Sequence, residues 1–107
     1  MKINIMKESI PYITDVTIAG TTFQFEFTYN SYDKRVYVTL YDIENNLIYP
    51  NEPILFGIPL WFNKLVDEKG NFNKKYPQKY IIPNTLDRKA VKIDYENIDK
   101  IELLVEE

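Results

Sequence analysis

The side chains that could do chemistry in this 107-residue chain are carboxylates, lysines and tyrosines, because the sequence contains no histidine and no cysteine. This composition excludes Ser-His-Asp and Cys-His catalysis, imidazole or thiolate metal sites, and disulfides within the chain. A pair of carboxylates across a cleft could still hydrolyse a glycosidic bond, and Glu26 with Asp42 or Asp94 are the candidates. Asp42, Glu44 and Asn45 offer oxygen ligands for calcium, but no recognised calcium loop surrounds them. Acids on strand faces are usually solvated, so we expect no enzyme and no metal site.

Aromatic side chains could instead stack against bases or sugars. Tyr37 and Tyr41 fall on one face of a predicted strand, and Trp61 follows in an apolar stretch. The net charge of −3 and the isoelectric point near 5.0 argue against a general nucleic-acid binder. No P-loop, dinucleotide-binding, zinc or EF-hand motif occurs in the sequence. A small β-barrel that binds carbohydrate or single-stranded nucleic acid with these three residues therefore stays open as an alternative function.

The elements that must position these residues are strands. Aromatic residues make up 15% of the chain, and they occupy every odd position from 23 to 29, with polar residues between them. This period of two predicts a half-buried strand over 21–29 whose aromatic row packs in the core, a ligand-stacking platform being the other interpretation. Residues 36–42 alternate in the same way after a short polar loop, which predicts a β-hairpin.

The rest of the chain indicates further short strands and no helix. We expect them around Ile3 and Ile5 and at 12–18, 47–49, 80–82, 89–95 and 100–105, with a short strand or an edge segment near 54–57. The predicted fold is an all-β, small antiparallel β-sandwich or barrel of about seven to nine short strands. We expect a single β domain over residues 1–107, with an irregular lysine-rich loop at about 63–79.

Charge is distributed unevenly along the chain. Five lysines and two acids give the 63–79 loop a net charge of +3, whereas six acids and one lysine give residues 94–107 a net charge of −5. The loop is either a solvated hairpin or an interaction loop. Opposite charges would suit contacts between neighbours in an assembly, because complementary charges orient partners. Tyrosine is also enriched at protein interfaces. The candidate protein-interface residues are Tyr37, Tyr41, Trp61, Phe72, Lys74, Lys75 and Tyr76.

Three parts of the sequence resemble the phage baseplate plug family. They are the aromatic strand 23–30 with its Tyr-Asn ending, the segment 35–42 with its Leu-Tyr-Asp turn entry, and Gly57-Ile58-Pro59-Leu60. A late Pro-Asn-Thr-Leu and a terminal strand also fit the layout of that family. The resemblance implies a non-enzymatic structural subunit at the centre of a tail baseplate, in a phage or a tail-like contractile particle. It implies no catalytic, cofactor-binding or metal-binding residues.

The resemblance also implies where the protein is found and what it contacts. The expected partners are hub and tail-tube proteins in a symmetric, multi-copy assembly, with the tape measure as a further candidate. The expected location is the virion tail baseplate or a tail-like particle, after synthesis in the cytoplasm of the bacterial host. No apolar run approaches the roughly 20 residues of a membrane span, and the charged N-terminus does not fit a signal peptide. We therefore expect neither a membrane nor a nucleic acid as partner.

Overall fold

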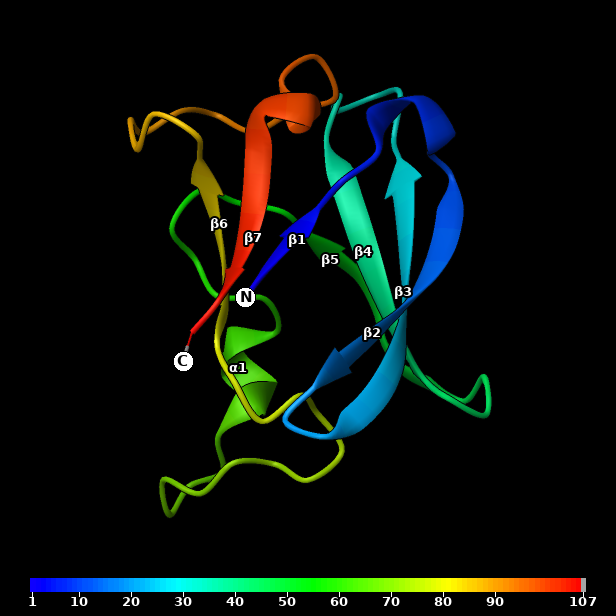
Figure 1. The fold of residues 1–107 in the computed structure, drawn as a ribbon, viewed down its shortest axis with the longest axis vertical. Coiled ribbons are helices and arrows are strands. Elements are labelled where there is room, and N and C mark those ends of the chain that lie inside the picture. The colour runs from blue at the N-terminus through cyan, green and yellow to red at the C-terminus, as the bar shows by residue number, and fades with distance from the viewer. Residues whose placement is uncertain (107) are drawn as a thin grey trace.

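The computed structural model describes residues 1–106, which form two antiparallel sheets that pack face to face (Figure 1). Seven strands occur within this range: β1 (Lys2–Asn4), β2 (Tyr12–Ile18), β3 (Thr21–Tyr29), β4 (Val36–Asp42), β5 (Leu47–Pro53), β6 (Ile81–Thr85) and β7 (Ile101–Val105). The same residues contain one four-residue helix, α1 (Phe62–Leu65), and two 3-10 helices, η1 (Lys7–Ser9) and η2 (Ile98–Lys100). The prediction of a small all-β fold is confirmed.

The larger sheet contains β2, β3, β4 and β5 in chain order, so each strand pairs with the next. β3 and β4 form the predicted hairpin, in continuous register along all seven residues of β4. β5 is longer than the strand expected at 47–49, because it continues through Pro50 to Pro53. Proline is tolerated there because β5 lies at the edge of the sheet, where a missing backbone N–H leaves no neighbour unpaired.

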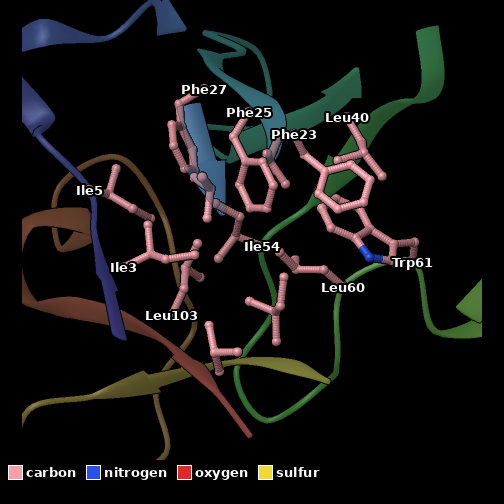
Figure 2. Close-up of a cluster of buried hydrophobic side chains, with 14 of the residues drawn as sticks. Ile3, Ile5, Phe23, Phe25, Phe27, Leu40, Ile54, Leu60, Trp61 and Leu103 are labelled. Carbon is pink, nitrogen blue, oxygen red and sulfur yellow. The ribbon is translucent and has the colours of Figure 1, made fainter. Parts of the chain in front are cut away.

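The aromatic face of β3 fills the space between the two sheets. Phe25 and Phe27 are fully buried and Phe23 nearly so, because alternation directs all three side chains to one face. Figure 2 shows them in the same cluster as Leu103 of β7, which belongs to the opposite sheet. Trp61 packs edge-on against Phe25, with ring centroids 5.6 Å apart and an interplanar angle of 87°. The prediction that this aromatic row packs in the core is confirmed.

The smaller sheet has the order β1-β7-β6, and its far edge is covered by chain that follows β5. The backbone N–H of Gly57 donates to the carbonyl of Pro83, and that of Leu60 donates to the carbonyl of Ile81, each at 2.9 Å. Of the two predictions for residues 54–57, a short strand or an edge segment, the structure therefore shows the edge segment. Their apolar character arises because the segment runs along β6 and contributes side chains to the core.

Residues 89–95 do not form the predicted strand either. Asn97 Nδ2 donates to the backbone carbonyl of Lys92 at 2.9 Å, so a side chain takes the place of a neighbouring strand. Ile93 is buried, whereas Val91 is 40% exposed. The alternation of this segment thus reflects Ile93 in the core and Tyr95 packed against it, rather than a buried sheet face.

The first prediction concerns the aromatic core. Phe25→Ala should lower the free energy of unfolding by about 3–5 kcal/mol, because it removes a buried ring and leaves a cavity beside Trp61. Urea denaturation followed by circular dichroism measures this. Tyr32→Ala is the control, since Tyr32 is 97% exposed, and it should change stability by no more than about 0.5 kcal/mol. Equal effects of the two substitutions would contradict the central place of β3 in the core.

Candidate protein interface

The outward face of the larger sheet carries a band of polar and aromatic side chains. Because the phenylalanines of β3 point into the core, the residues between them, Gln24, Glu26 and Thr28, point outward. The register places Tyr41 beside Gln24 and Tyr37 beside Thr28. All five side chains are half-buried and contribute to the molecular surface. Both β4 tyrosines of the predicted interface therefore lie on one accessible face.

Carboxylates orient these two tyrosines. The hydroxyl of Tyr41 donates to Glu26 Oε1 at 3.1 Å, and burial together with this hydrogen bond raises the pKa of Tyr41. The hydroxyl of Tyr37 donates to the carboxylate of Asp33, which raises the pKa of Tyr37 and lowers that of Asp33. With its hydroxyl held, each ring has a defined orientation and offers an amphipathic contact surface.

The strands of the larger sheet carry acids but no lysine or arginine. The four acids are Asp15, Glu26, Asp42 and Glu52. Asp15 is exposed on β2, and Ile13, on the same face of that strand, is 53% exposed. Sequence reasoning did not single out Ile13 or Asp15, although the alternation over 12–18 places both on the outward side. Asp15 and Glu26 point outward, whereas Asp42 pairs with the inward-facing Phe23 and Glu52 pairs with the buried Val38. The outward face thus combines two carboxylates with the apolar surface of Ile13, which suits a partner with basic and apolar side chains.

A shallow groove adjoins the Tyr37 end of this face. It has a volume of about 540 Å³, and its lining includes Tyr29, Tyr32, Tyr37 and Asn51. Because Tyr32 is 97% exposed, one aromatic ring stands free at the rim of the groove. The groove extends the aromatic surface of the sheet toward the loop between β3 and β4.

The lysine-rich segment forms a separate surface. It begins with α1, whose Leu65 is fully buried, and turns back at Asp67, whose carboxylate accepts hydrogen bonds from the backbone N–H groups of Lys69 and Asn71 at 2.9 Å. In Figure 1 the chain after α1 forms a loop that projects at the lower end of the molecule. The segment carries Lys64, Lys69, Lys74 and Lys75 exposed and Lys79 half-buried. It is thus anchored near both ends by the buried side chains of Leu65 and Tyr76 and presents four of its lysines to solvent.

The seven residues predicted for the interface occupy three places. Phe72, which is 37% exposed, lies with Lys74 and Lys75 on the lysine-rich segment. Tyr37 and Tyr41 lie on the outward sheet face, as described above. Trp61 and Tyr76 are 1% and 6% exposed, so in the isolated chain both belong to the core.

Trp61 lies in a strained turn that sequence reasoning missed. Its φ of 45° is in the left-handed region, which costs a bulky residue about 1–3 kcal/mol. The backbone N–H of Trp61 donates to the carboxylate of Glu52, and this contact ties the turn to β5. Burial raises the pKa of Glu52, while the hydrogen bond from Trp61 opposes that shift. No sequence motif marks this pair, because its geometry depends on the positive φ at Trp61.

Glu26 and Asp42, two of the carboxylates considered for catalysis, are not placed to act together. Glu26 pairs with Thr39 and Asp42 pairs with Phe23, so the two acids point to opposite faces of the sheet. Asp42 accepts hydrogen bonds from the backbone N–H groups of Glu44 and Asn46, which engages its carboxylate in the turn after β4. Among residues 1–106, no group of three or more acids is placed to hold a metal ion.

Comparison with known proteins gives one match. The sequence model of the family described as "Cyanophage baseplate Pam3 plug gp18" matches residues 1–105. The chain belongs to the phage baseplate plug family. The resemblance seen in the sequence is thereby confirmed, and the chain is a structural protein of a phage baseplate. No curated protein and no solved structure matched it.

For a baseplate plug protein, surfaces that contact other proteins are a better candidate site than a ligand-binding cleft. The alternative based on Tyr37, Tyr41 and Trp61 requires three rings that converge, but Trp61 packs inward against Phe25 while the tyrosines face outward. Within the described part of the chain, no helix is long and apolar enough to cross a bilayer. The outward sheet face and the lysine-rich segment are therefore the candidate interfaces of this plug protein.

The second prediction concerns Glu52 and Trp61. The raised pKa of Glu52 means that the fold disfavours the charged carboxylate relative to the neutral acid. The stabilisation from the neutral acid is therefore fully present below the unfolded-state pKa and is lost as pH rises through the folded-state pKa. Glu52→Gln keeps an acceptor for the Trp61 N–H and carries no charge. Its stability relative to wild type should therefore increase as pH rises from about 4 to 7.

Thermal unfolding across this pH range measures the effect, and Glu52→Ala is the matched control. That variant leaves the buried N–H without its acceptor and should be less stable than Glu52→Gln by about 1–3 kcal/mol at every pH. If the difference in stability between Glu52→Gln and wild type did not change with pH, the raised pKa of Glu52 would be contradicted.

Proposed function

We propose that this plug-family protein is a structural subunit at the centre of the baseplate of a phage tail or a tail-like contractile particle. There it packs against hub and tail-tube proteins in a symmetric assembly. The observation that carries this proposal is a pair of exposed surfaces of opposite charge on one core: the outward sheet face, which bears Asp15, Glu26 and two tyrosines, and the lysine-rich segment that begins with α1.

The two surfaces lie at different places on the molecule. The lysine-rich loop projects beyond α1 at the lower end, whereas β2 and β3 lie along the opposite side from β6 and β7 (Figure 1). A subunit with separate charged surfaces can contact two neighbours at once, and complementary charges then set orientation and suppress wrong contacts. The two sheets share one hydrophobic core, which supports treating the chain as a single domain that acts as a rigid unit.

The tyrosine-lined groove favours a second candidate function. Tyr29, Tyr32 and Tyr37 border a shallow, polar hollow of the kind that can stack against a sugar ring. On this alternative, the isolated chain is a binding module for carbohydrate or single-stranded nucleic acid. Micromolar binding of an oligosaccharide or a single strand by the monomer, without co-assembly with tail proteins, would favour it over the structural role.

The third prediction tests the basic surface. The chain is co-expressed with the hub and tail-tube proteins of the same tail, and the complex is isolated by size-exclusion chromatography. Lys74→Glu combined with Lys75→Glu should weaken incorporation about tenfold or more, because it reverses two exposed charges at the proposed contact. The remaining association should also depend less on salt concentration.

A matched control is available in the same chain. Lys89→Glu combined with Lys92→Glu makes the same change of net charge at two exposed lysines outside the segment. This control should assemble as wild type does. Equal loss in both double variants would assign the effect to net charge alone, and no loss in either would remove the lysine-rich segment from the interface.

A further inference from the structure

The outer edge of β2 is a row of unpaired backbone groups. β2 pairs with β3 in continuous register over all seven of its residues, from Tyr12↔Phe27 to Ile18↔Thr21. Within the described chain, no backbone hydrogen bond from a turn or loop reaches residues 12–18. In an antiparallel ladder alternate residues direct their N–H and C=O groups away from the partner strand. Those groups of β2 therefore have no backbone partner among residues 1–106.

The other three sheet edges are short or protected. β1 has three residues, and β6 is covered by the backbone hydrogen bonds from Gly57 and Leu60. β5 contains Pro50 and Pro53 and has register shifts against β4, features that prevent regular pairing with another strand. β2 has no proline, no lysine and no break in register. It is the one long, regular and uncovered edge among residues 1–106, which is the form of edge that folded proteins protect unless they use it.

The side chains along this edge indicate what kind of strand fits. Asp15 and Ile13 point to the outward face, and their partners across β3 are Gln24 and Glu26. An incoming strand would therefore lie beside two carboxylates, one of them directly on the edge, and beside an exposed isoleucine. A lysine or arginine opposite Asp15 and an apolar residue near Ile13 would complement this surface, as cross-strand pairs do.

A second copy of β2 does not meet these requirements. The antiparallel register that pairs all seven residues of two β2 strands places Asp15 directly opposite Asp15 of the other copy. Like charges in that position destabilise a ladder. The occupant that fits is a strand of a different sequence.

We propose that the free edge of β2 accepts an extended strand from another baseplate protein, with a basic residue opposite Asp15 and an apolar residue beside Ile13. This extends the four-stranded sheet across the subunit boundary. The inference rests on the proposed baseplate role and specifies how one of its contacts is made. Main-chain hydrogen bonds give the contact its strength, and the side chains at Ile13 and Asp15 give it register.

Hydrogen exchange tests the proposal on the wild-type chain, alone and in the complex with co-expressed hub and tail-tube proteins. The β2 amides that bond to β3 should be protected in both states. The alternate set should exchange freely in the isolated chain and slow by about tenfold or more in the complex. Equal exchange of that second set in both states would overturn strand addition while leaving the baseplate role intact. Absence of the chain from the complex would overturn both.

A pair of matched variants gives an independent readout. Ile13→Lys and Leu47→Lys make the same change on opposite edges of one sheet, at residues that are 53% and 57% exposed. Ile13→Lys should reduce incorporation into the complex about tenfold, because lysine on an edge opposes pairing and would repel the basic residue of the partner. Leu47→Lys should assemble as wild type does. Equal behaviour of the two variants, or self-association of the isolated chain through β2, would overturn the proposal.

Discussion

The burial of three phenylalanines on one face of β3 is the constraint on which the surface of this protein depends. Strand side chains alternate, so placing Phe23, Phe25 and Phe27 between the two sheets commits the residues between them to the outside. Continuous pairing of β3 with β2 and β4 extends the same division across three strands. The hydrogen bond between Glu26 and Tyr41 on the outward face is thus a consequence of how the core is filled.

Sequence periodicity predicted the β3–β4 hairpin and its buried row because those residues are half-buried on a regular sheet. The same reasoning failed for 89–95, where alternation is present but a side-chain hydrogen bond from Asn97 replaces a neighbouring strand. It also missed the contact between Glu52 and Trp61, since nothing in the pattern indicates a positive φ at a tryptophan. Side-chain acceptors and left-handed turns depend on the tertiary structure, so a one-dimensional period does not show them.

Family membership and geometry support the same account from different directions. The plug-family match covers nearly the whole chain, and the structure shows which of its surfaces are exposed. Asp15 and Glu26 on the outward sheet face and the lysines of the 63–79 segment lie on separate surfaces, and Trp61, which the sequence suggested for an interface, packs in the core of the isolated chain. On the proposal made above, contacts with neighbours involve the sheet face, the edge of β2 and the lysine-rich loop, while the shared hydrophobic core holds these surfaces together.

The most direct test of the structural role is electron cryomicroscopy of the purified tail particle at a resolution that shows side chains. The account predicts repeated copies of this fold at the centre of the baseplate, with the outward face of β2–β5 and the lysine-rich segment both covered by neighbouring proteins. A complete baseplate whose density contains no copy of this chain would contradict it. So would copies whose two charged surfaces both face solvent.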